Sequence, residues 1–153
     1  MKTYDVNSKK WRKFKARYQD LRISKAALNL LITDPAKFKS CCNGVGSTRG
    51  FWGKLTYHLI PNTIWFMSIT PASDLHDVDY SIPAEFDTIE HALAYKKDAD
   101  NRMYQNMNLL IDRRGGWLQK MREIRAFEYF EILRTCGTDS FLSEKIILNN
   151  LKY

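Results

Sequence analysis

The chain has 153 residues and a formal net charge of +7. At this length we expect a single domain, residues 1–153, which can bury about two thirds of its unfolded surface and hold a core without disulfides or metal ions. Its three cysteines, Cys41, Cys42 and Cys136, are an odd set without a C-x-x-C spacing, which indicates neither a disulfide framework nor a zinc site. No apolar run approaches the length that spans a bilayer, and residues 1–25 are charged rather than apolar, so we expect no signal peptide. We therefore expect synthesis in the cytoplasm, and contact with membrane only after lysis, inside a virion, or from the cytosolic face.

The first 25 residues hold nine Lys or Arg against two Asp, a local charge of +7 that equals the charge of the whole chain. Residues 1–33 are predicted to form a basic amphipathic helix that begins at a Ser8 cap. Its apolar positions follow helical steps: Trp11, Phe14, Tyr18, Leu21, Leu28 and Ile32. Such a helix can dock its apolar stripe on the core, lie on anionic lipid or another protein, or contact nucleic acid.

No zinc-finger, RNA-recognition or other base-reading signature accompanies this charge, so nucleic acid is not favoured as a partner. A phospholipid membrane or another protein fits a basic amphipathic surface better. The residues that we expect on this membrane or partner surface are Lys10, Trp11, Lys13, Arg17, Phe51 and Trp52.

Asp34 and Pro35 are predicted to open a short helix that ends near Gly44. The stretch from Cys42 to Ser47 is a glycine-spaced turn, in which backbone carbonyls can point inward because glycine accepts dihedral angles that other residues avoid. Hard cations such as Ca²⁺ bind such oxygens. The turn lacks the Gly-Lys-Ser/Thr ending of a phosphate loop, which argues against nucleotide binding.

Residues 55–69 form either a short β-hairpin around Pro61-Asn62 or an apolar wall. The aromatic side chains in and before this stretch are candidates for an acyl-chain site, with a place in the core equally open. They are Phe51, Trp52, Trp65 and Phe66.

A short helix is predicted from Pro71 to about Tyr80, since Pro at the first helical position after a Thr cap is a helix-start signal. His76 and Tyr80 lie four residues apart and share one face, whereas Asp77 is rotated by about a hundred degrees round the axis. A base and a cation ligand are thus adjacent but point in different directions. A surface helix with an acidic flank and a core histidine remains the alternative.

The capping box Asp87-Thr88-Ile89-Glu90 predicts a long helix to about Arg113 that ends at Gly115-Gly116. Asp100 lies in this helix near the apolar Ala99 and Met103, so it can point inward and orient a histidine of a neighbouring helix.

The C-terminal part, residues 117–153, is predicted to form two helices. The first runs from Trp117 to Cys136 and is stopped by Gly137, and a short one follows from Ser140. Apolar residues of the first recur at helical spacing: Trp117, Met121, Ile124, Phe127 and Leu133. Its arginines are expected on a solvated face: Arg122, Arg125 and Arg134.

A glycine-rich loop, a helix with His-Asp-x-x-Tyr and a later helix with a second Asp resemble the phospholipase A2 superfamily, particularly its small microbial, parvoviral and phage-borne branches, over roughly residues 41–107. The resemblance implies a mainly α fold in which two long antiparallel helices hold a short catalytic helix against the loop. It makes His76 the general base, Asp100 the residue that orients it, and Tyr80 the support of Asp100. Asp77 and the carbonyls of Cys42, Gly44 and Gly46 would bind Ca²⁺.

The sequence departs from this family in two places. The interval from Gly46 to His76 is long, and Ser47 stands where many members carry another glycine. Secreted members are also rich in disulfides. These differences concern the calcium loop more than the His76 and Asp100 pair.

The implied chemistry is calcium-dependent hydrolysis of a phospholipid ester by a protein associated with a phage or virion. A neutral histidine takes a proton from water near neutral pH. A carboxylate fixes its tautomer and stabilises the imidazolium, while Ca²⁺ polarises the ester carbonyl. Phospholipid and other virion proteins are the implied partners.

Two other functions stay open. The first is a catalytically silent relative that serves as a virion or host-interaction protein. The second is a His-Asp metal phosphohydrolase that uses His58, His76, Asp77 and either Asp112 or Asp139; it needs His58 on a helix, whereas the following Leu-Ile-Pro favours an extended chain. His91 has no assigned role.

Overall fold

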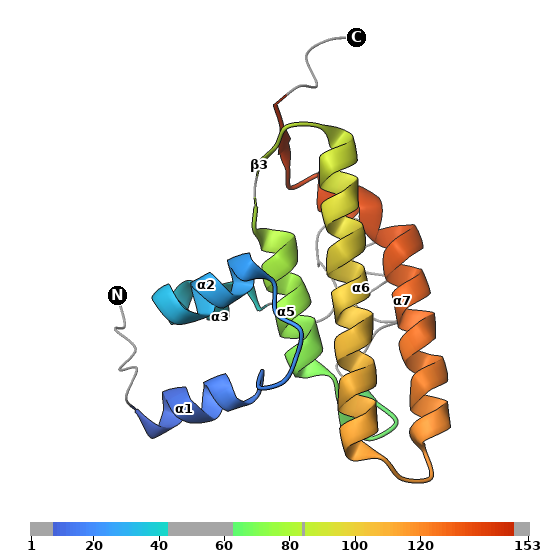
Figure 1. Ribbon diagram of the computed structural model, residues 1–153. Coiled ribbons are helices and arrows are strands. Elements are labelled where there is room, and N and C mark those ends of the chain that lie inside the picture. The colour runs from blue at the N-terminus through green and yellow to red at the C-terminus, as the bar shows by residue number, and fades with distance from the viewer. Residues whose placement is uncertain (1–7, 43–62, 84, 149–153) are drawn as a thin grey trace.

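The computed structural model describes residues 8–42, 63–83 and 85–148, and it is mainly helical, as the sequence predicted (Figure 1). Two long antiparallel helices, α6 (Ile89–Arg114) and α7 (Gln119–Leu142), stand side by side. The short helix α5 (Thr70–Ser81) packs against α6. Three N-terminal helices lie beyond α5: α1 (Lys9–Ala16), α2 (Lys25–Thr33) and α3 (Pro35–Cys41).

In the described residues, four two-residue strands accompany the helices. β1 (Thr63–Ile64) and β2 (Met67–Ser68) form an antiparallel hairpin directly before α5. β3 (Glu85–Phe86) pairs in parallel with β4 (Ile146–Ile147), which lies where a C-terminal helix was expected. Within the described part of the chain, no helix is both long and apolar enough to cross a bilayer.

The continuous helix predicted for residues 1–33 is wrong. Ser8 caps α1 as expected and accepts from the Trp11 amide, but the chain turns at Asp20, whose φ of 64° is a left-handed value that Asp tolerates. Ser24 then caps the separate helix α2. As a result Leu28 and Ile32 are exposed instead of extending the buried stripe.

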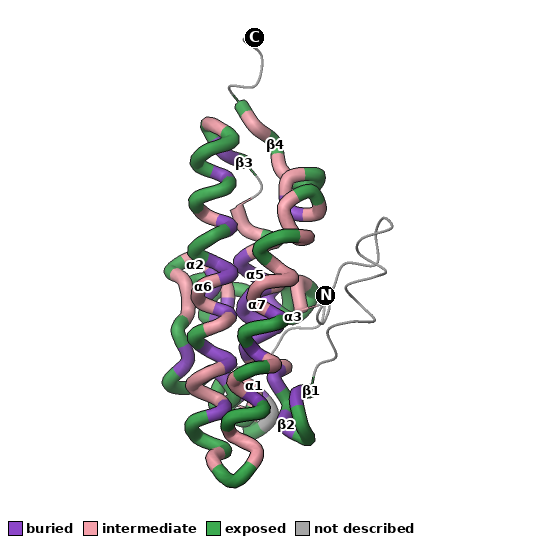
Figure 2. The backbone as a smooth tube through the Cα atoms, turned by 90° about the vertical axis from the view of Figure 1, so that its right-hand side faces the viewer, coloured by how far each residue is buried: buried purple, intermediate pink, exposed green. Residues whose placement is uncertain are grey.

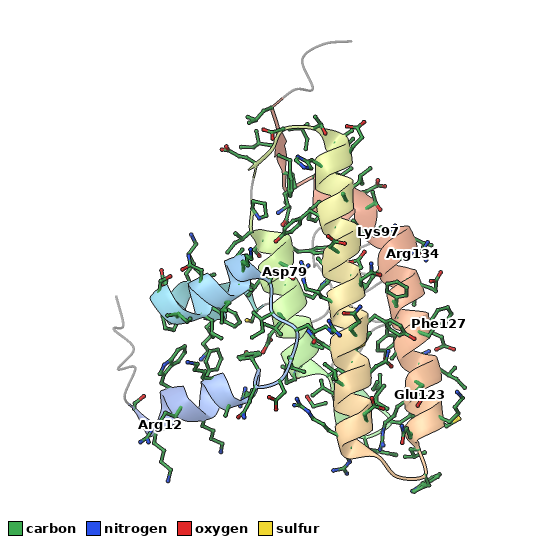
Figure 3. All side chains as sticks on the ribbon, in the orientation of Figure 1. Arg12, Asp79, Lys97, Glu123, Phe127 and Arg134 are labelled. Carbon is green, nitrogen blue, oxygen red and sulfur yellow. The ribbon has the colours of Figure 1, made fainter. Side chains whose placement is uncertain are left out.

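Side chains of α5 and α6 hold these N-terminal helices in place. Asp79 on α5 accepts from Ser24 Oγ and, at 2.9 Å, from Arg102 Nε, so it joins α2, α5 and α6 (Figure 3). Asn106 on α6 accepts from the Arg22 amide at 2.7 Å and donates to the Arg22 carbonyl at 2.9 Å. These buried polar contacts fix the connection between α1 and α2 against α6.

The starts of α5 and α6 lie within a residue or two of the predicted ones. α5 already includes Thr70, so its N-cap is Ile69, which makes no side-chain capping bond. α6 begins after Thr88, whose Oγ1 accepts from the His91 amide, one residue later than the expected capping box. It ends at Gly115, which has a φ of 56°, as predicted.

Helix α7 differs from its prediction in length and in facing. It continues through Gly137 to Leu142. Its buried residues are Arg122, Ala126, Tyr129 and Phe141, whereas the apolar series Trp117, Met121, Ile124 and Phe127 is exposed. The reason is that α7 carries apolar residues on two faces, and it packs through the face where the small Ala126 allows close approach to α6.

The hairpin turns at Trp65 and Phe66, which have φ angles of 44° and 61°. The predicted turn at Pro61-Asn62 lies outside the described residues. Phe66 is 88% exposed, which excludes the core position that was left open for it.

Helix α5 lies between two hydrophobic clusters. One joins the hairpin to α6 and α7 through residues such as Ile69, Met103 and Tyr129. The other joins α5 to α1, α2 and α3 through residues such as Leu31, Phe38 and Leu75. In Figure 2 the buried residues gather where α5, α6 and α7 meet. Because α5 is covered on both sides, even its polar residues Ser73, Asp74, His76 and Asp79 are buried.

Candidate active site

The contact predicted between His76 and Asp100 is present where α5 packs on α6. His76 Nε2 lies 2.9 Å from Asp100 Oδ1, and the Tyr80 hydroxyl donates to the same oxygen at 2.7 Å. The side chains of His76 and Asp100 are 7% and 1% exposed. The rings of His76 and Tyr80 are 4.0 Å apart between centroids. Two residues one turn apart on α5 therefore converge on a single carboxylate oxygen of α6.

Lys96 also binds Asp100, and the sequence did not identify it. Its ammonium donates to Asp100 Oδ2 at 2.7 Å and to the Leu133 carbonyl at 3.0 Å. Both Lys96 and Asp100 are buried. The spacing of four residues is a signal for such a pair, but most pairs with this spacing lie on the surface, so the spacing alone does not place the lysine inside.

The partners of Asp100 decide its charge. Burial is the largest influence and raises the pKa of Asp100, but the hydrogen bond and charge of His76, together with hydrogen bonds from Lys96 and Tyr80, outweigh burial and lower that pKa below its usual value. Burial, reinforced by Asp100, raises the pKa of Tyr80 well above its usual value. Asp100 is thus a carboxylate and Tyr80 a neutral phenol that donates to it.

Gly137 of α7 covers the other side of this cluster. A Cβ at this position would lie 3.4 Å from the Tyr80 hydroxyl and 3.6 Å from Lys96 Cε and Nζ. A larger side chain would displace one of these two partners of Asp100. The glycine that the sequence suggested as a helix stop therefore serves as a close contact inside the helix.

The proposed calcium ligands lie only partly in the described residues. Cys42 and Asp77 are described, and Gly44 and Gly46 are not, nor are Phe51, Trp52 and His58. Burial, followed by the charges of Asp74 and Asp77, raises the pKa of the Cys42 thiol. The Cys42 thiol also lies 3.9 Å from the Asp74 carbonyl, so the end of α3 contacts α5.

The described residues contain no group of three or more His, Cys, Asp or Glu side chains that could hold a metal ion. The calcium site implied by the resemblance uses one carboxylate with backbone carbonyls, and the hard oxygen of Asp77 fits this donor set.

Ser73 is a further polar residue of α5, to which the sequence assigned no role. Its hydroxyl is buried and has no hydrogen-bond partner among the described residues. Ser73 lies three residues before His76 and four before Asp77, so helical spacing places it on the same side of α5. It supplies an unused donor and acceptor beside both.

The expected membrane or partner surface is partly wrong. Trp11 is 7% exposed and stacks on Phe14 at 5.4 Å, so it belongs to the core. Lys13 and Arg17 are exposed on and just after α1, as expected. Lys10 lies on α1, but its side chain is outside the described part.

The prediction that the arginines of α7 lie on a solvated face is also only partly right. Arg125 and Arg134 pair on the surface with Glu128 and Glu131, as predicted. Arg122 does not lie on a solvated face, because it is buried and donates to the carbonyls of Trp65 and Gly115.

The metal-phosphohydrolase arrangement is not assembled by the described residues. Asp112 is exposed, contacts Gln119 and lies twelve residues beyond Asp100, about 18 Å along the helix. Asp139 is exposed on α7. His91 is exposed near Asp87, at 3.8 Å.

No family model matches the chain, and no curated protein or solved structure matches it either.

Proposed function

We propose that this protein is a phospholipase A2-like hydrolase that cleaves a carboxylic ester of a phospholipid. The observation that carries the proposal is the buried constellation of His76, Asp100 and Tyr80 across the packed helices α5 and α6. The likeness to the phospholipase A2 core and the association with a phage or virion belong to the same proposal.

In this mechanism His76 is the general base. Its Nε2 faces the Asp100 carboxylate, so the proton on that nitrogen is held there and Nδ1 is the atom left to accept a proton from water. The water then attacks the ester carbonyl carbon, and His76 returns the proton to the leaving alcohol. Asp100 stabilises the imidazolium that forms between these steps.

Tyr80 keeps the Asp100 carboxylate in place through its 2.7 Å hydrogen bond. Asp77 would hold Ca²⁺, with the carbonyl of Cys42 and those of Gly44 and Gly46. Bound there, Ca²⁺ supplies polarisation of the ester carbonyl and stabilisation of the oxyanion.

The test is release of fatty acid from mixed phospholipid vesicles with millimolar Ca²⁺. We expect hydrolysis by the native chain, and its loss in His76→Ala and in Asp77→Asn. His91→Ala is the matched control, because His91 is an exposed histidine outside the cluster, and it should keep full activity. Absence of hydrolysis by the folded native chain would contradict the proposal, and activity that persists with a calcium chelator would contradict the calcium requirement.

One observation favours a second candidate, a catalytically silent virion or host-interaction protein on the same scaffold. Lys96 places a buried cation on Asp100, and this cation offsets part of the negative charge that would stabilise an imidazolium at His76. A well-folded native chain that fails in the vesicle assay, while Lys96→Met gains activity, would support a site held silent by this lysine.

A further inference from the structure

Three large aromatic side chains project into solvent from two neighbouring turns. Trp117, in the connection between α6 and α7, is 90% exposed. Phe66 and Trp65, at the tip of the β1–β2 hairpin, are 88% and 44% exposed. Both turns lie at the lower end of the molecule in Figures 1 and 2. Single exposed apolar residues are ordinary, but a cluster at one end marks an interaction site.

Arg122 holds the two turns together. It is buried, and its guanidinium donates to the Gly115 carbonyl at 2.8 Å and to the Trp65 carbonyl at 3.3 Å. One side chain thus fixes the inter-helix connection and the hairpin tip as a single unit. The turns that carry the three aromatic residues are therefore joined through Arg122.

The backbone at the hairpin tip has a conformation that is unfavourable for bulky residues. Trp65 and Phe66 have φ angles of 44° and 61°, values at which hairpins favour Asn and Gly because bulky residues are strained there. Strained backbone of this kind is concentrated at functional sites. Aromatic residues at these two positions are therefore better explained by an external contact than by the turn itself.

Positive charge lies at the same end. Arg113, at the end of α6, donates to the Gln19 carbonyl at 3.0 Å and pairs with Asp20 at 3.4 Å, so the chain that follows α1 lies against the end of α6. α1 contains five Lys or Arg and no Asp or Glu in its eight residues. Arg12 is exposed on α1 (Figure 3), and Arg114, which is exposed at the end of α6, precedes Trp117 by three residues. Lys120 is paired with Glu123, and the exposed Asp112 lies near the same turn, so the excess of positive charge at this end comes mainly from α1 and Arg114.

We propose that this basic aromatic end, defined by Arg12, Lys13, Trp65, Phe66, Arg114 and Trp117, docks on an anionic phospholipid surface. Aromatic side chains that enter the headgroup region beside Lys and Arg are the pattern of interfacial membrane binding. A second copy of the chain is a poorer occupant, because two such ends would bring cations of like sign together.

The choice of phospholipid rests on the proposed function, and the position of this end suits that function. The hairpin leads directly into α5, and His76 lies six residues beyond Thr70, about 9 Å along the helix. Docking through the hairpin would therefore bring lipid close to the start of the catalytic helix.

The test measures binding without hydrolysis. His76→Ala protein is cosedimented with vesicles of phosphatidylcholine alone and with vesicles that also contain phosphatidylglycerol. We expect binding to the anionic vesicles, and an affinity lowered by about tenfold or more when Phe66→Ala and Trp117→Ala are added, since two large apolar groups no longer insert. Lys13→Gln with Arg114→Gln should weaken binding to anionic vesicles and reduce its dependence on salt.

Phe127→Ala is the matched control, because Phe127 is a half-exposed aromatic on the outer face of α7, away from this end (Figure 3). Circular dichroism checks the fold of each variant. Binding reduced equally by Phe127→Ala and by the double aromatic variant would overturn the proposal. So would concentration-dependent dimerisation that the double variant abolishes, because it would assign this end to a second copy. Binding retained by a native chain that does not hydrolyse lipid would refute the proposed function alone.

Discussion

Lys96 and Asp100 form a buried ion pair on one face of α6, with Nζ 2.7 Å from Oδ2, while His76 and Tyr80 bind the other oxygen of the same carboxylate. The described polar contacts of the Asp100 side chain thus come from three residues. In the proposed mechanism His76 and Tyr80 take part in catalysis, and Lys96 offsets the negative charge of the carboxylate. The site is a network rather than a simple dyad, and its members should respond to mutation together.

The ion pair should make the two residues strongly coupled in stability. Lys96→Met and Asp100→Asn should each lower the free energy of unfolding by about 3–5 kcal/mol, because each leaves a buried partner without its opposite charge. The double variant should lose clearly less than the sum of the two single changes. Urea denaturation of the four proteins measures this coupling.

The matched control is the Lys120 and Glu123 pair on α7, whose lysine is exposed. Removal of either partner there should change stability by less than about 1 kcal/mol. Additive losses at Lys96 and Asp100 would contradict the buried pair.

Stability should depend on pH through Asp100. Its pKa is lowered in the folded chain, so the stabilisation is fully present above the unfolded-state pKa of about 4 and is lost as the pH falls through the folded value. The difference in unfolding free energy between the native chain and Asp100→Asn should therefore be constant at neutral pH and shrink below about pH 4. If the difference in unfolding free energy instead grew as the pH fell, the pKa of Asp100 would be raised in the folded chain and the prediction would be wrong.

Gly137 should tolerate a methyl group and little more. The Cβ of Gly137→Ala would make ordinary contacts with Tyr80 and Lys96, and alanine favours the helix by up to about 1 kcal/mol, so stability should be kept or raised. Gly137→Val should push Tyr80 or Lys96 away from Asp100 and lower both stability and any hydrolysis. Thermal unfolding and the vesicle assay compare the two variants, and equal behaviour of both would refute the close approach.

The exposed face of α7 should be insensitive to polar substitution. Ile124→Lys should change stability by less than about 0.5 kcal/mol, because Ile124 is half exposed. Ala126→Leu should cost about 1–3 kcal/mol, since this alanine is fully buried against α6. Chemical denaturation measures the loss of stability in each variant. A larger loss in Ile124→Lys than in Ala126→Leu would show that the face of α7 with Ile124 is the buried one, as the sequence pattern suggested.

Cys42 should be a slow thiol in the folded chain. Burial and the nearby carboxylates raise its pKa, which leaves little thiolate at neutral pH. Alkylation by iodoacetamide, followed by peptide mass spectrometry, should proceed much more slowly at Cys42 in buffer than in urea. Equal rates in the two conditions would contradict this environment.

The sequence by itself determined the local features. Helix starts at Ser8 and Asp34 follow from side-chain caps that act within a few residues, and the start of α6 at Thr88, which follows from the same kind of cap, was predicted one residue too early. The shared direction of His76 and Tyr80 follows from the helical repeat. The mainly helical class follows from the same periodicity, because hydrogen bonds within helices are local.

Only the tertiary structure decided which face of each helix is buried and which side chains pair with one another. The N-terminal stripe was broken at Asp20 because Ser24 starts a second helix that is fixed to Asp79 on α5. Ala126 of α7 is buried and Ile124 is half exposed, because α7 packs on α6 through the face that fits closely. Lys96 became part of the site because a buried carboxylate needs a cation, and its identity depends on which helices meet.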